Sequence, residues 1–131
     1  MALLINAYRA LFDRLSNDEV LAAFVQGVFD YVPEESEFPC VVIREFNSSP
    51  FTSKTSNGKR IEFTIEVWNV LTGNQEMIRI IDHIEALLVS ELIIEDAFFI
   101  AQEMKRIELL KDEETSLNQG KMMFELIIES E

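Results

Sequence analysis

Apolar and polar residues alternate from Arg60 to Val70, which predicts a β-strand with two unlike faces. Because successive side chains of a strand point to opposite sides, one face is wholly apolar and carries Ile61, Phe63, Ile65 and Val67. The other face begins polar, with Arg60, Glu62, Thr64 and Glu66. Trp68 and Val70 then place apolar side chains on that polar face, so we expect a helix of the chain or another subunit to cover this end.

An earlier strand is predicted from Phe38 to Phe46, where most residues are β-branched or aromatic and Pro39 takes a starting position. The connection 47–58 consists mainly of small polar residues and ends in Asn57-Gly58, a pair typical of turns between antiparallel strands. We therefore expect a long hairpin. Residues 47–60 include no acidic residue and carry the basic residues Lys54, Lys59 and Arg60.

Two further segments have the periodicity of amphipathic helices. In residues 4–15 the apolar stripe consists of Leu4, Tyr8, Leu11 and Leu15, widened by Ile5 and Phe12. In residues 77–88 it consists of Met77, Ile81, Ile84 and Leu88. Ser16 and Glu19 fit a capping box, so a short helix from about residue 17 to residue 25 should follow the first helix.

Residues 98–110 suit two structures. Ile100, Met104, Ile107 and Leu110 have helical spacing, and several residues between them are good helix formers. Residues 122–129, however, alternate as a strand with one apolar face, and the polar stretch 112–120 before them could be a hairpin connection. Such a hairpin would require 98–110 to be the incoming strand. The residues alone leave both structures open.

Length and composition limit the classes of protein. A chain of 131 residues can bury one core without disulfides or metals, so we expect residues 1–131 to form one domain. Cys40 is the only cysteine, which is compatible with a reducing cytoplasm. The formal net charge of −13 gives no electrostatic basis for specific nucleic-acid binding. No apolar run approaches the roughly 20 residues of a membrane-spanning helix.

Few residues suggest catalysis. His83 is the only histidine and is expected to be solvated on a helix surface. Cys40 could pair with it as a nucleophile, but a free cysteine in an apolar strand usually behaves as a small buried hydrophobe. Asp112, Glu113 and Glu114 form a charge run expected to be solvated. Phosphate loops, dinucleotide fingerprints and zinc or calcium signatures are missing, so we expect no enzyme, cofactor or metal.

Four segments in order resemble the tail completion proteins, or tail terminators, of long-tailed bacteriophages and prophages. They are Val28-Phe29-Asp30-Tyr31-Val32-Pro33, Phe38-Pro39-Cys40-Val41-Val42-Ile43, Ser49-Pro50-Phe51-Thr52-Ser53-Lys54-Thr55 and Phe63-Thr64-Ile65-Glu66-Val67-Trp68, followed by the helix to Leu88. The resemblance is strong from about Val28 to Leu88 and faint afterwards. The acidic stretch 112–120 departs from the family, in which the last turn is usually shorter.

The resemblance implies an α+β fold similar to that of lambda-type tail terminators. In that fold two main helices pack on one face of an antiparallel β-sheet of four to five strands. It further implies that 98–110 is a strand, and we adopt this against local propensity because tertiary pairing commonly overrides weak preferences. Members of the family form a ring, typically a hexamer, that caps the tail tube and joins the tail to the head connector.

The implied function is that of a virion structural protein at the head–tail interface, assembled in the cytoplasm of the bacterial host. Its partners would be its own copies, the tail tube protein and the head–tail connector protein, with no membrane and no specific nucleic acid. The expected contact residues are Phe51, Lys54, Lys59, Arg60 and Trp68. Phe51 either tucks into its own loop or anchors a partner. The alternative function is a small-ligand or protein-binding α+β module without catalytic activity.

Overall fold

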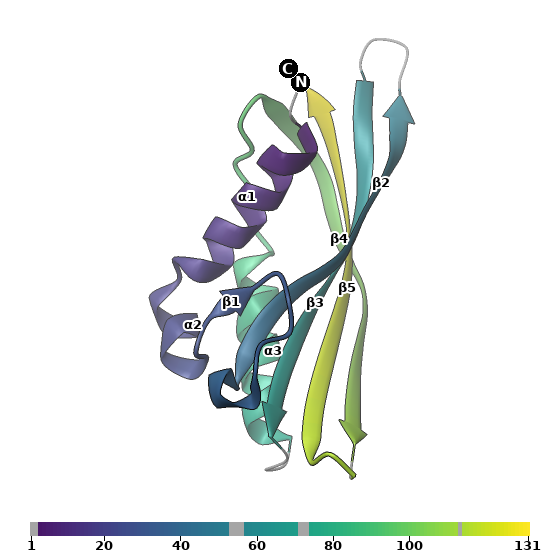
Figure 1. Cartoon of the computed structure of the whole chain (residues 1–131). Helices are drawn as coiled ribbons and strands as arrows, with labels where there is room; N and C mark the ends of the chain where they lie inside the picture. The colour runs from purple at the N-terminus through teal and green to yellow at the C-terminus, as the bar shows by residue number, and fades with distance from the viewer. Residues whose placement is uncertain (1–2, 53–56, 71–73, 113) are drawn as a thin grey trace.

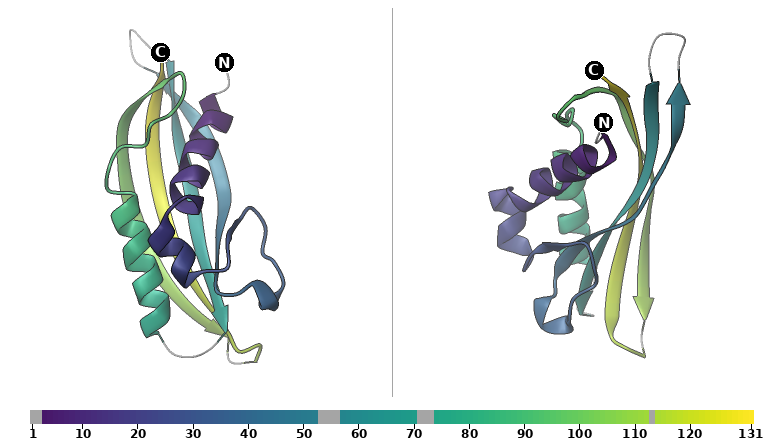
Figure 2. Two further views of the ribbon diagram at one scale, coloured as in Figure 1. Left: turned by 90° about the vertical axis from the view of Figure 1, so that its left-hand side faces the viewer. Right: turned by 45° about the horizontal axis from the view of Figure 1, so that its top comes forward.

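The computed structural model describes residues 3–52, 57–70, 74–112 and 114–131. One five-stranded sheet has the helices packed against one of its faces (Figure 1). The elements are α1 (Leu3–Ser16), α2 (Glu19–Phe24), β1 (Val28–Phe29), η1 (Glu35–Glu37), β2 (Cys40–Thr52), β3 (Asn57–Val70), α3 (Gln75–Leu87), β4 (Ala97–Asp112) and β5 (Leu117–Ser130). The α+β class is confirmed, and the two main helices, α1 and α3, lie on the same face (Figure 2).

The strand order is β1-β2-β3-β5-β4. The pairs β2–β3, β3–β5 and β4–β5 are antiparallel. The short strand β1 pairs with β2 in the parallel direction, so the sheet is mixed where we expected an antiparallel one. No helix in the described part of the chain is long and apolar enough to cross a membrane.

The core lies between the helices and the apolar face of the sheet. Phe63 of β3 is directly opposite Phe124 of β5, and their rings stack with centroids 5.2 Å apart. Helices contribute Leu11, Leu15, Ile80 and Ile84, all of which are fully buried. Burial of each such side chain contributes about 1.5–3 kcal/mol relative to leaving it in water. The alternation read between Arg60 and Val70 therefore identifies the core face of β3 correctly.

Residues 98–110 form a strand, as the resemblance implies, and the helical propensity of this segment is overridden. β4 pairs with β5 from Ala97 opposite Ser130 to Asp112 opposite Leu117. The turn between them is therefore shorter than the connection we expected over residues 112–120. Asp112 helps to form this turn, because its Oδ1 accepts a hydrogen bond of 3.0 Å from the backbone N–H of Glu114. Glu113 lies outside the described residues.

The expected hairpin is present, but its strands run further into the polar connection than predicted. Ladder pairing continues from Asn47 opposite Glu62 to Thr52 opposite Asn57. Small polar residues with little strand propensity are thus held by pairing with the neighbouring strand. Lys54 lies outside the described residues.

The buried face of helix α1 differs in part from the predicted apolar stripe. Leu4 and Ile5 are exposed, whereas Asn6 is buried. The burial of Asn6 is possible because its Nδ2 donates a 3.0 Å hydrogen bond to the backbone oxygen of Glu95. The buried stripe of the helix consists of Leu3, Ala7, Leu11 and Leu15.

Helix α2 begins at a cap that we did not predict. Asp18, rather than Ser16, is the N-cap, and its Oδ2 accepts a 2.8 Å hydrogen bond from the backbone N–H of Leu21. The same oxygen lies 2.7 Å from Nε2 of His83 on α3. His83 is therefore engaged with Asp18 and is not simply solvated. This contact joins α2 to α3, which periodicity within either helix could not reveal.

The face of the sheet opposite the helices, which we call the helix-free face, is partly covered by residues 30–39, which we call the strap. Phe38 of the strap lies against Trp68, with ring centroids 6.1 Å apart. Cys40 and Val42 are fully buried although they project to this side of β2. The cover expected over Trp68 thus comes from the same chain, but from the strap rather than a long helix. Val70 remains exposed.

The hydrogen bonds from His83 and Leu21 lower the pKa of Asp18. Its carboxylate should therefore stabilise the fold above the ordinary pKa of about 3.9, and this stabilisation should be lost as the pH falls through the lowered value. We predict that Asp18→Ala lowers the free energy of unfolding by about 1 kcal/mol at neutral pH. Asp18→Asn, which keeps a capping oxygen, should lose less. Urea unfolding measures both.

The control is Asp82→Asn, which removes a charge from the exposed face of α3 and should change stability by less than about 0.5 kcal/mol. In acid, where the Asp18 carboxylate is protonated, wild type and Asp18→Asn should converge. A difference that stays the same from neutral pH to below about pH 3 would contradict the assigned role of the charge.

Candidate assembly surfaces

The β2–β3 hairpin is the first candidate surface, because its ends project beyond the helices (Figure 1). Phe51 lies in this projecting part, and the guanidinium carbon of Arg60 is 5.4 Å from the centre of its ring. Arg60 Nε also lies 3.6 Å from Oε1 of Glu125 on β5. Phe51 thus packs within its own hairpin, and Arg60 is held between an aromatic ring and a carboxylate.

The basic residues of the hairpin do not form one patch in the described structure. Arg60 is opposite Ile127 and lies on the helix-free face. Lys59 is opposite Ile128, a buried core residue, and therefore lies on the other face. Alternation along a strand separates neighbours in this way, so a count of charges in the sequence overstated the local positive surface.

Gly58 fixes how tightly the hairpin joins the sheet. A Cβ atom at this position would lie 2.5 Å from the backbone oxygen of Ile128 and 2.7 Å from that of Phe51. Both oxygens belong to backbone, which cannot move aside as a flexible side chain could. The glycine therefore permits β2, β3 and β5 to approach one another where the hairpin leaves the body of the protein.

Trp68 lies at the other end of the helix-free face, beside the strap. Its Nε1 donates a 3.0 Å hydrogen bond to Oε1 of Glu66, which is only 2% exposed. The same oxygen lies 3.4 Å from Nη1 of Arg44. A buried carboxylate is stable only when it is hydrogen-bonded or ion-paired. Trp68 therefore stabilises the Glu66 carboxylate, in addition to any contact it makes with another subunit. Of the predicted contact residues, Phe51 and Arg60 lie at one end of the helix-free face and Trp68 at the other, whereas Lys59 lies on the opposite face.

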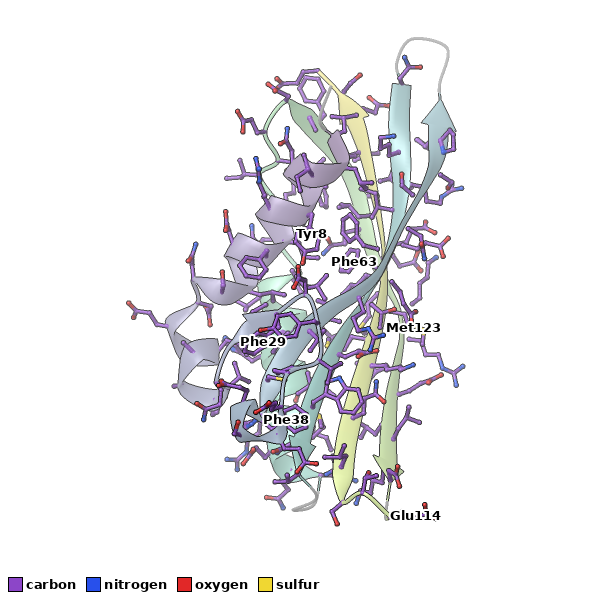
Figure 3. All side chains as sticks on the ribbon, in the orientation of Figure 1. Tyr8, Phe29, Phe38, Phe63, Glu114 and Met123 are labelled. Carbon is purple, nitrogen blue, oxygen red and sulfur yellow. The ribbon has the colours of Figure 1, made fainter. Side chains whose placement is uncertain are left out.

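A polar hollow of about 280 Å³ lies between these ends and was not predicted from the sequence. Its polar lining consists of Glu45, Asn47, Glu62, Thr64, Lys105 and Glu125. Glu45 has a positive φ of 54° and belongs to a bulge in β2, where two residues face one on β3. Met123 also lines the hollow and projects away from the helices, whereas Phe63 has its ring on their side (Figure 3).

Charge is distributed unevenly between the two layers. Residues 3–38 contain two basic residues, Arg9 and Arg14, and helix α3 contains one, Arg79. The strap alone carries Asp30, Glu34, Glu35 and Glu37, and the connection 88–96 carries Glu91, Glu95 and Asp96. The described strands carry acids and bases in nearly equal number. The acidic surplus therefore belongs to the helices and connections.

The chemistry of the lone thiol is that of a core residue. Burial raises the pKa of Cys40 to about 12, so the reactive thiolate is scarce near neutral pH. Cys40 projects to the helix-free side of β2, whereas His83 lies on a helix against the other face. The structure therefore does not bring the two together. Among the described residues, no group of three or more His, Cys, Asp or Glu side chains is placed to hold a metal ion.

A family model described as Tail completion protein gp17 matches residues 9–129. The tail completion protein gp17 of Bacillus phage SPP1 is 26% identical over 104 residues, covering 79% of this chain and 78% of that protein. A chain from the virion of a native gene transfer agent particle matches with a TM-score of 0.86 at 21% identity, covering 98% of both chains. The SPP1 gp17 structure gives a TM-score of 0.68 at 22% identity, covering 94% of this chain and 88% of that one.

The two structural matches show a shared fold, since their sequence identities are low. The family match carries more weight because it spans nearly the whole chain, from the middle of α1 to the end of β5. It also includes every segment on which the sequence resemblance was based. The chain therefore belongs to the family of tail completion proteins gp17, which are structural proteins of phage tails.

Proposed function

We propose that this protein is a tail terminator, which caps the end of the tail tube as a ring, typically of six copies, and joins the tail to the head connector. Family membership is the observation that carries the proposal. Identical subunits that meet head to tail close into a ring when the rotation between neighbours closes. Such a ring has two different faces, and a terminator needs one for the tail tube protein and one for the head–tail connector protein.

The projecting end of the β2–β3 hairpin supports a contact with the tube or with a neighbouring subunit. The hairpin extends past the helices, and Gly58, opposite Phe51, lets this end of the hairpin approach β5 closely (Figure 1). Strands that are already paired in the sheet lose less conformational entropy on binding than an unpaired segment would. In this proposal Phe51, Lys54, Lys59 and Arg60 contribute to the contact, and Trp68 belongs to a second contact region at the other end of β3.

The alternative function, a small-ligand or protein-binding module, would require a pocket. The candidate is an apolar groove of about 300 Å³ between α1 and β1, lined by Tyr8, Phe12, Phe29 and Tyr31 among others. This groove lies at the side of the sheet, where a neighbouring subunit of a ring would approach. We therefore favour an assembly role for this groove.

The hairpin contact is tested with the double variant Phe51→Ala, Lys54→Ala. Loss of an aromatic anchor and a charge should weaken binding to the tube by about 2 kcal/mol, or roughly thirtyfold. We expect tails of irregular length and few joined particles in electron micrographs of a phage supplied with the variant. Arg79→Ala, which removes one charge from an exposed position on α3, is the control and should give normal tails. Normal termination by the double variant would exclude the hairpin contact.

A non-catalytic role is tested at Cys40. Raising the pKa from 9.0 to about 12 lowers the thiolate population near neutral pH about a thousandfold, and burial restricts access further. Iodoacetamide should therefore alkylate Cys40 in the native protein at least about a hundredfold more slowly than in urea. Cys40→Ala should still terminate tails. Rapid native alkylation together with loss of function in Cys40→Ala would favour thiol chemistry instead.

A further inference from the structure

The two sides of the sheet are both incomplete in the single chain. β4 is the last strand at one side and pairs only with β5. At the opposite side, β1 pairs with β2 at Val28 and Phe29 alone. Unpaired strand edges invite association with other strands, so a stable protein either blunts them or covers them.

The edge formed by β4 is irregular in its first part, which disfavours pairing with another strand, and regular in its second part. Its pairing with β5 is interrupted by bulges between Phe99 and Ala101 and between Met104 and Arg106. From Arg106 to Asp112 the pairing is regular. In this stretch Ile107, Leu109 and Leu110 are 37%, 40% and 43% exposed. Arg106 and Lys111 flank these apolar side chains together with Glu108 and Asp112, and Arg106 forms an ion pair with Glu108. A regular edge with exposed aliphatic residues requires a cover.

The side formed by β1 offers a matching surface. The apolar groove between α1 and β1 opens here, and Tyr31 on its rim is 60% exposed. Tyr31 begins an outward-facing part of the strap that continues with Val32. The acids of the strap, Asp30, Glu34, Glu35 and Glu37, follow at the same side without any basic residue among them. The surface thus combines an apolar groove, lined also by Arg9 and Asp13, with the acids of the strap.

We propose that residues 106–112 of β4 in one copy dock against the β1 side of the next copy, between the groove and the strap. Ile107 and Leu109, on the helix side of β4, cover the groove, and Lys111 meets the strap acids. This inference rests on the proposed function, because it specifies the contact that repeats around the ring. The partner is a second copy of this chain, since the two complementary surfaces are present on one subunit and cannot meet within it.

Strand direction supports a head-to-tail contact. β1 is parallel to β2, and each following pair in the order β2-β3-β5-β4 is antiparallel, so β4 runs opposite to β1. A rotation about an axis along the strands preserves their directions. It therefore brings β4 of one subunit antiparallel to β1 of its neighbour, and repetition of the same rotation can close a ring. The β4 end and the strap lie on opposite sides of the lower half of the molecule in Figure 1.

The competing arrangement is a two-fold dimer in which β4 pairs with β4. That dimer would cover the aliphatic residues but leave both grooves and both straps open. The head-to-tail contact covers both incomplete sides at once and places Lys111 near the strap acids.

Cysteine cross-linking in assembled tails distinguishes the two arrangements. We would incorporate the double variant Tyr31→Cys, Leu110→Cys into tails, treat them with a short bis-maleimide and separate the chains under denaturing conditions. Both positions are exposed in the subunit, so neither variant should impair folding. Native Cys40 is buried and should not react. We expect a ladder of cross-linked species up to the full ring. Each single variant should remain monomeric, as should the control pair Tyr31→Cys, Arg79→Cys.

Each result decides between the models. Dimers from Leu110→Cys alone would show β4–β4 pairing and overturn the inference. Absence of the ladder in tails that terminate normally would also overturn it, while the proposed function would stand. If neither wild type nor variant enters tails, the proposed function fails. The same cross-linking at high protein concentration then decides the contact: a ladder from the double variant supports it, and monomers overturn it.

Discussion

The register between β3 and β5 is the constraint on which the rest of the structure depends. Phe63 lies opposite Phe124 at the centre of the sheet, and the flanking pairs put Ile61 with Leu126 and Ile65 with Met122. A slip of one residue would turn all of these side chains to the opposite face. The helices would then lose their core. The observed register places the buried residues Ile61, Phe63 and Ile65 beside Leu126, Phe124 and Met122, all on the face that the helices cover.

The approach of α3 to this sheet depends on a missing side chain. A Cβ atom on Gly120 would lie 2.7 Å from Cδ1 of Ile81 and 3.0 Å from Sδ of Met77. The glycine thus gives the helix room to lie directly on β5. With the helices placed on one face, the helix-free face is left to the strap, the polar hollow and solvent. The surfaces assigned to assembly are those that helix packing leaves uncovered.

The elements that could be predicted from the sequence are those whose signal is local. Alternation identifies β3, and periodicity identifies α1 and α3, because a single buried face dictates each pattern. β4 could not be predicted in this way, since its edge position requires no continuous apolar face and its residues suit a helix. The residues left helix and strand open, and only the family resemblance decided for the strand. The contact between Asp18 and His83 was missed for a related reason, because the two residues are 65 positions apart in the chain.

The candidate surfaces also combine features that the sequence predicts with features that depend on contacts between distant residues. Phe51, Lys59 and Arg60 were identified as a group by proximity in sequence, yet the pleat and the Phe51–Arg60 contact place them in different surroundings. The strap and the bulge at Glu45 depend on where distant segments of the chain meet, so the periodicity of the sequence does not predict them. What the sequence does convey is composition: acids concentrate in the segments outside the strands.

Trp68 is the only tryptophan of the chain, and the strap holds it between Phe38 and the carboxylate of Glu66. Its indole emission is sensitive to the polarity around the ring and to the hydrogen bond at Nε1. Displacement of the strap would change both together, with no second indole to dilute the signal. The protein therefore contains an intrinsic fluorophore at the base of its helix-free face, and rearrangements there can be followed in real time without a dye.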